Sequence, residues 1–268
     1  MTPSNHPVVE EGSRKKASYR PASSSSSFLL PSSSQPVCEV RWLGLVEYEN
    51  AWRHQRKLAE RRAAGEISDT LLLLEHPPVY TTGKRTAGSN LRLPVDMLGA
   101  PLVVSDRGGD ITFHGPGQLI AYPIIDLRAG GLGAVTYVRN LEEVIVRTLR
   151  DYGIESTLEC GLTGVWVGID KIAAIGVRVS RPGGASGGWV TTHGLALNVD
   201  VDLAWFNGII PCGIADRGVT SMERVLGTAP PIPDVAERLT AHFAQIFGRE
   251  MRAINNPLTT ATATSPAV

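Results

Sequence analysis

The chain has little of several features that mark common classes of protein. Only 3 of its 268 residues are cysteine, and the formal net charge at pH 7 is +0 with an isoelectric point near 7.0. A neutral balance argues against a nucleic-acid binder, which usually carries a basic excess. Cys38, Cys160 and Cys212 are odd in number and far apart, without metal-ligand spacing. This pattern fits a reducing, cytoplasmic compartment better than a disulfide framework, and it predicts no bound metal.

Long apolar runs are also missing. No run approaches the roughly 20 residues that a helix needs to cross a bilayer, and the N-terminus lacks the apolar centre of a secretion signal. We therefore expect a soluble protein without a membrane partner. With 43% hydrophobic and 19% charged residues, the chain is long enough for one sizeable core and too short for two comfortable domains.

Both ends of the chain have low complexity. Residues 1–37 contain a run of five serines and five prolines with little periodicity, and residues 257–268 are similar in character. Such segments bury too little apolar surface to offset the entropy of ordering, so we expect both to be disordered. Basic residues among serines in the first segment would also suit a transit peptide, but Glu10 and Glu11 count against it. This leaves one predicted domain over residues 38–250.

The first half of that domain combines strands with helices. Residues 38–48 alternate as in a strand, and apolar residues then recur at helical spacing from Ala51 to Ala63. The run TLLLLEH, at 70–76, has the length and composition of a strand buried on both faces. A second helix is predicted from the stripe Val135, Val138, Leu141, Ile145 and Leu149, ended by Gly153.

The second half changes character. Residues 154–199 read as antiparallel hairpins, with turns at 169–170 and 181–188. Thr220 and Glu223 have the spacing of a capping box, and a last helix is predicted to open at Asp234. Together these elements predict an α+β fold, a mixed β-sheet flanked by helices.

One stretch stands out from this background: RGGDITFHGPGQ, residues 107–118. It places four glycines and a proline between Val103–Val104 and Leu119–Ile120, which read as strands. A loop so rich in glycine lets a ligand or another backbone come close, and Arg107 and His114 would be its polar groups. A glycine-rich hairpin whose histidine bonds its own backbone is an equally open alternative.

This stretch closely resembles the pattern of the lipoyl(octanoyl) transferases, the octanoyl-carrier-protein to protein N-octanoyltransferases. Further matches follow in the same order: LIAYPIIDL from Leu119, KIAAIGVRV from Lys171, THGLALNV from Thr192 and NGIIPCGI from Asn207. The resemblance covers about residues 40–247 and implies the fold shared by biotin and lipoate protein ligases.

The resemblance also implies a nucleophile and its partner. Cys212 lies in the segment IIPCGI and matches the cysteine that forms the family's acyl-thioester intermediate, and Lys171 matches the lysine paired with that cysteine. Without the resemblance, Cys212 would more often be an inert buried thiol, and Lys171 a hairpin lysine that reaches solvent.

Substrate binding is implied for three segments. Their residues are Arg107, Gly108, Gly109, Asp110, Ile111, Thr112, Phe113 and His114, then Ala174, Ile175 and Gly176, and finally Gly194, Leu195 and Ala196. Because carrier proteins are acidic, we also expect a basic docking patch at Lys84, Arg85 and Arg107.

The implied reaction needs no cofactor. Octanoyl-acyl carrier protein would donate its acyl group to Cys212, and the acceptors would be lipoyl domains of 2-oxoacid dehydrogenases and the glycine cleavage H protein. Two alternatives remain: an ATP-dependent lipoate or biotin protein ligase, which has no need of Cys212, and a non-catalytic module that binds an acyl group or a carrier protein.

Overall fold

The structure is a computed structural model that describes residues 35–84, 90–184, 187–213 and 217–254, with the main chain alone at Cys212. The predicted disordered segments therefore lie outside the described residues, except for 35–37. No helix in the described part of the chain is long and apolar enough to cross a membrane.

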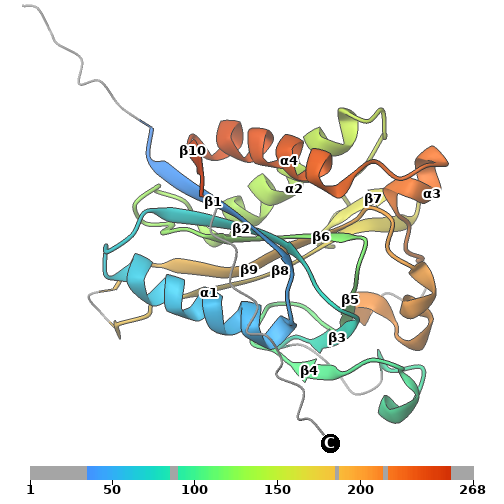
Figure 1. Ribbon diagram of the computed structural model, residues 1–268. Coiled ribbons are helices and arrows are strands. Elements are labelled where there is room, and N and C mark those ends of the chain that lie inside the picture. Colours follow the sequence, from blue (N-terminus) through green and yellow to red (C-terminus); the bar gives the residue numbers. More distant parts are fainter. Residues whose placement is uncertain (1–34, 85–89, 185–186, 214–216, 255–268) are drawn as a thin grey trace, which may run out of the picture. The chain divides into compact units, whose positions relative to one another are not determined.

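A seven-stranded mixed sheet forms the centre of the fold (Figure 1). Its strand order is β10-β1-β2-β6-β9-β8-β7, with β10, β1 and β2 parallel and the remaining neighbours antiparallel. The strands are β1 (Val37–Leu45), β2 (Asp69–Glu75), β6 (Gln118–Ile124), β7 (Val165–Val167), β8 (Asp170–Ser180), β9 (Val190–Asn198) and β10 (Glu250–Ala253). The predicted hairpins correspond to β7, β8 and β9 and are confirmed.

Helices cover both faces of this sheet, and the four leucines of β2 show how. Leu71 and Leu73 face a core closed by α2 (Ala134–Arg150) and α4 (Ile232–Phe247), whereas Leu72 and Leu74 face α1 (Tyr48–Ala63). In Figure 1, α2 and α4 lie above the sheet and α1 lies below it. Successive side chains of a strand point to opposite faces, so an unbroken apolar run is what a strand between two helical layers requires. The predicted doubly buried strand is confirmed.

A smaller sheet extends the structure beside the main one. It consists of β4 (Leu102–Val104), β3 (Val79–Thr82) and β5 (Thr112–His114), in that order. Its own apolar core includes Tyr80, Phe113 and Phe206, the last from the 3-10 helix η4 (Leu203–Gly208). Residues 107–118 were predicted to be a loop throughout, so β5 corrects that prediction: pairing with β3 gives its buried side chains a core to enter.

Several element boundaries also differ from the prediction. The first strand ends at Leu45 rather than at residue 48, and Tyr48 opens α1. In α2, Val135 is 77% exposed and is not part of the buried stripe. Helix α4 begins at Ile232, two residues before Asp234, behind a proline cap.

Near the C-terminus two features were missed. The helix α3 (Met222–Leu226) is capped by Ser221, whose hydroxyl accepts the Arg224 N–H at 3.2 Å, so the proposed Thr220 capping box is wrong by one residue. Strand β10 was not predicted, because its side chains are polar and mostly exposed. It is held by pairing with β1 and by the neighbouring ion pair between Arg249 and the buried Asp69, 2.9 Å.

Candidate active site

The glycines of the 107–118 segment allow backbone to approach backbone. The Gly108 N–H donates to the Val177 carbonyl of β8 at 2.9 Å. A Cβ at Gly176 would lie 2.9 Å from the Gly108 carbonyl oxygen, and one at Gly83 would lie 2.3 Å from that of Gly109. Larger residues would push these segments apart. The loop therefore lies against β8, where its glycines let another backbone come close.

Arg107 anchors this loop to β3. Its Nε and Nη2 donate to the Thr81 hydroxyl at 3.1 and 2.9 Å, and Nη2 also donates to the Thr81 carbonyl at 2.6 Å. Only 7% of Arg107 is exposed. Its predicted part in a basic docking patch is therefore wrong, while Lys84 is exposed and Arg85 lies outside the described residues.

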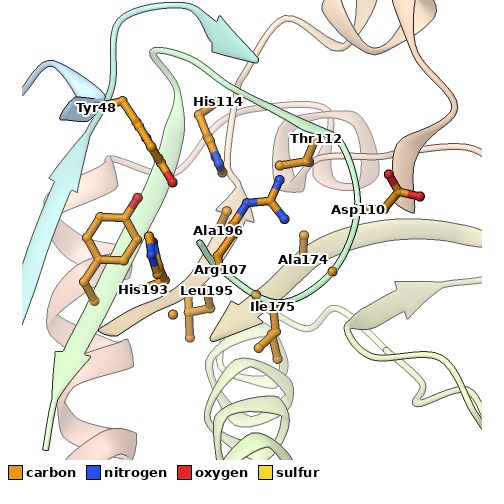
Figure 2. Close-up of a pocket in the computed structure, with 14 residues that line it drawn as sticks. Tyr48, Arg107, Asp110, Thr112, His114, Ala174, Ile175, His193, Leu195 and Ala196 are labelled. Carbon is orange, nitrogen blue, oxygen red and sulfur yellow. The ribbon is translucent and has the colours of Figure 1, made fainter. Parts of the chain in front are cut away.

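The loop and the neighbouring strands β8 and β9 enclose a pocket of about 450 Å³, part of which is open to solvent (Figure 2). It collects all the predicted binding residues except Gly108, Ile111 and Phe113: Arg107, Gly109, Asp110, Thr112, His114, Ala174, Ile175, Gly176, Gly194, Leu195 and Ala196. Ile111 and Phe113 belong instead to the core of the small sheet. Small and aliphatic residues supply most of this lining, which suits an apolar ligand.

Three further residues line the pocket and were missed: Tyr48, Tyr122 and His193. Tyr48 was taken as the end of a strand and Tyr122 as part of a buried one. His193 lies directly before the predicted Gly194, inside the quoted motif from Thr192. The residue type was the one available signal, since histidine adopts a positive φ more often than most residues other than glycine.

The backbone of β9 is indeed unusual at this histidine. His193 has φ = 57°, the positive value that glycine favours, and its N–H donates to the buried Gln55 side chain at 2.6 Å. Strands β6 and β9 pair as far as Ala121 and Leu195, and they meet again in the same register at Asp126 and Val190. Between these points lies Pro123 of β6, which has no N–H for the ladder; a Cβ at Gly194 would lie 2.8 Å from its ring. His193, in this interruption of the ladder, lines the pocket.

The rings of Tyr48, His76, His114 and Tyr122 pack together at the end of the pocket where His193 lies. His114 Nδ1 lies 2.7 Å from the Gln118 amide oxygen, so it carries the proton and donates. Burial, followed by the nearby charges of His76 and Arg107, holds the pKa of His114 well below its usual range. His114 is therefore neutral at physiological pH and is poorly suited to take up a proton.

Lys171 lies in an adjoining cavity. This cavity shares Thr112 and Ala174 with the main pocket and is also lined by Asn198 and Pro211. Only 7% of Lys171 is exposed; its Nζ lies 3.4 Å from the Thr163 carbonyl oxygen and 4.9 Å from the centre of the Trp166 ring. The alternative of a hairpin lysine that reaches solvent is therefore wrong. A buried ammonium group at the end of an apolar pocket is a functional candidate.

The segment that carries Cys212 returns to this cavity from both sides. Pro211, directly before Cys212, lines it, and further along the chain Val219 lines it again. The Thr220 N–H donates to the Lys171 carbonyl at 3.0 Å. Because consecutive Cα atoms are about 3.8 Å apart, the main chain of Cys212 lies one residue from the Lys171 cavity.

The other two cysteines offer a contrast. Cys38 is fully buried in β1, where burial raises the pKa of its thiol, so it remains protonated. Cys160 is exposed on the surface. Neither lines the pocket or the cavity that holds Lys171.

The fold and the pocket agree with the protein family that the sequence matches. Residues 47–244 match the family model described as the lipoyl protein ligase A/B catalytic domain, and the chain belongs to this family. Its curated relatives include proteins named octanoyltransferase. That of Chloroflexus aggregans is 50% identical over 221 residues, which are 81% of this chain and 96% of the relative. That of Rubrobacter xylanophilus is 49% identical over 215 residues, 78% and 94% of the two chains.

Solved structures confirm the predicted fold. A lipoate-protein ligase A bound with ATP superposes with a TM-score of 0.60 at 16% identity, covering 83% of this chain and 90% of that one. A putative lipoate protein ligase of Thermoplasma acidophilum with bound lipoic acid gives 0.60 at 16% identity, over 81% and 89%. At such low identity the likeness concerns the fold alone.

Proposed function

We propose that this protein is an acyltransferase that moves an octanoyl group from octanoyl-acyl carrier protein to a lysine of a lipoyl domain. One observation carries the proposal: the buried Lys171 and Pro211, the residue directly before Cys212, line one cavity beside an apolar pocket. Thr112 and Ala174 join that pocket to the Lys171 cavity. The relatives named octanoyltransferase, about half identical over four-fifths of the chain, support the same activity.

In the first step the Cys212 thiolate attacks the carbonyl carbon of the donor thioester. A new thioester forms on Cys212, the carrier thiol leaves as a thiolate, and that thiolate takes up the proton released from Cys212. The Lys171 ammonium would favour the Cys212 thiolate and relay the proton. Because one thioester replaces another, the exchange is close to isoenergetic and needs no ATP or metal.

In the second step the acceptor amine attacks the acyl-enzyme. An amide bond forms, the Cys212 thiolate leaves, and the proton lost from the amine passes through Lys171 to restore the starting state.

The acceptor is proposed to be a lipoyl domain. An archaeal relative in fold is described together with its E2 lipoyl domain, which supports this kind of partner for the present chain. Lipoyl domains of 2-oxoacid dehydrogenases and the H protein of glycine cleavage remain our predicted acceptors.

The decisive experiment is intact mass measurement after mixing the protein with octanoyl-acyl carrier protein. We expect one octanoyl adduct, lost in Cys212→Ser and retained in the matched variants Cys38→Ser and Cys160→Ser. An adduct that survives in Cys212→Ser would reject this nucleophile.

The same samples separate the two rival functions. An ATP-dependent ligase would need free octanoate with ATP and would use the carrier-bound acyl group poorly. A binding module would retain the donor without forming any covalent adduct. Transfer to a lipoyl domain without ATP would exclude both.

A further inference from the structure

The pocket has a polar end remote from Lys171, and this end bears on which acyl groups the pocket accepts. The point rests on the proposed function, because it concerns the acyl group that Cys212 receives. Three aromatic residues, Tyr48, Tyr122 and His193, close that end and are here called the end wall. In Figure 2, Tyr48 and His193 lie on the side of the pocket opposite Asp110 and Thr112.

Strand register gives the direction of the acyl chain. On β8, Lys171 precedes Ala174 and then Gly176, and β9 places Ala196 and Gly194 opposite the last two. The pocket and the Lys171 cavity join at Ala174. At about 3.3 Å per residue, Val177 lies roughly 10 Å further along the strand, and it is paired with His193. An eight-carbon chain whose carbonyl lies at this junction would therefore run over Gly176 and end near His193.

The end wall is held in place by buried hydrogen bonds. The Tyr48 hydroxyl donates to the Ser105 hydroxyl at 2.8 Å, and the Tyr122 hydroxyl lies 2.9 Å from His76 Nε2. The His193 Nε2 lies 2.7 Å from an Asp106 carboxylate oxygen.

All three wall residues are buried, so a longer chain could pass only by breaking some of these bonds. Broken buried hydrogen bonds and overpacking are both costly.

We propose that the end wall sets the upper limit of acyl-chain length, with His193 as the specificity-determining residue. Asp106 acts as a positioning residue, since it holds the imidazole of His193 and does not itself line this pocket. The wall therefore excludes an acyl group longer than the pocket, both by its volume and by the hydrogen bonds that would be lost.

The principal test variant is His193→Gly. Glycine adopts φ = 57° without strain, so this change opens the wall while leaving the local backbone conformation favourable. His193→Asn is an intermediate step, because asparagine also tolerates positive φ and fills part of the space. Tyr48→Leu opens the wall from a different element, and Tyr137→Leu is its matched control in the core under α2, away from the pocket.

The measurement is single-turnover acylation of Cys212 by octanoyl-, decanoyl- and dodecanoyl-acyl carrier protein, followed by intact mass. The result is the ratio of decanoyl to octanoyl rate constants within each variant, which does not depend on the fraction of protein that is folded. Each newly buried methylene is worth roughly fourfold. We expect the ratio to rise about tenfold or more in His193→Gly and Tyr48→Leu, less in His193→Asn, and not in Tyr137→Leu.

An unchanged ratio in both His193→Gly and Tyr48→Leu would overturn the end wall while leaving the proposed function intact. An equal rise in Tyr137→Leu would also overturn it, since the effect would then come from general loosening. If wild type accepts no acyl group from any of the three donors, the proposed function fails, and this inference fails with it.

Discussion

The two faces of the main sheet differ in what they bury. The face under α2 and α4 buries a large apolar cluster that includes Leu71, Leu141 and Phe243, with a few polar side chains such as Glu142 and Thr148 of α2. The face under α1 begins in the same way but, toward the pocket, buries Gln55, His76 and other hydrogen-bonding groups. The first arrangement suits stability. The second is costly unless each polar group has a partner, and such groups are typical of functional sites.

Removal of Lys171 should have the largest effect on the rate of octanoyl transfer. Loss of a general acid–base group commonly slows a reaction by about 10²–10⁴-fold. We expect Lys171→Ala to slow both steps of octanoyl transfer within that range, with partial recovery of acylation at high pH as Cys212 ionises unaided. The rates of single-turnover acylation and deacylation, measured against pH, test both expectations.

Lys171→Arg serves as the control, since arginine keeps the positive charge but does not release a proton. It should retain more of acylation than of transfer to the amine. Wild-type rates in Lys171→Ala would mean that the proton acceptor lies elsewhere.

In the core under α2 and α4, Phe243→Ala should have the reverse profile. Phe243 is buried in α4 and stacks on Phe247 at a centroid distance of 4.3 Å. Phenylalanine-to-alanine changes in a core cost about 3–5 kcal/mol. Urea unfolding should show a loss of that size, while the acylation rate per folded molecule stays near wild type. A specific loss of catalysis would show that the helical face is coupled to the pocket.

On the face under α1, His76 should make the stability of the protein depend on pH. His76 Nδ1 donates to the Val46 carbonyl, and burial lowers the pKa of the ring to about 4. Because the unfolded pKa is near 6.5, the unfolded chain binds this proton first, so stability falls as pH drops below about 6.5. The loss from this group reaches on the order of 3 kcal/mol by pH 4.

A non-titrating variant tests the assignment. The cost of His76→Gln should be smaller at pH 4.5 than at pH 7, when both are measured by urea unfolding. An equal cost at the two pH values would exclude His76 as the titrating group.

Sequence reasoning predicted best where one pattern had one physical cause. The four leucines of β2 could alternate between two helical layers only in a doubly covered strand, and the glycines at 108 and 176 do allow close backbone approach. Motif resemblance located the pocket residues on three separate segments.

The parts that were missed depend on contacts between distant residues. The positive φ of His193 accompanies a hydrogen bond from its N–H to the side chain of Gln55, 138 residues earlier. Strand β10 exists because β1 offers it an edge, although its own residues show no strand pattern. Arg107 looked like a free surface cation because its partner, Thr81, belongs to another strand. No local periodicity could contain this information.

The smallest expected effect concerns the cap of α3, close to the Lys171 strand. Thr220 pairs with Lys171 through its backbone, and Ser221 next to it accepts the Arg224 N–H. Loss of a serine cap costs about 1 kcal/mol, because one helix N–H is left without its partner. Ser221→Ala should therefore lower the free energy of unfolding by about 1 kcal/mol. Ser221→Asp, which keeps an acceptor, should lose less.

Octanoyl transfer should be unaffected in both Ser221 variants, since the Lys171 contact uses the Thr220 backbone. Urea unfolding and single-turnover acylation, measured on the same preparations, test whether the cap affects stability alone. A fall in acylation that follows the loss of the cap would mean that α3 positions Lys171 and has a functional role besides stability.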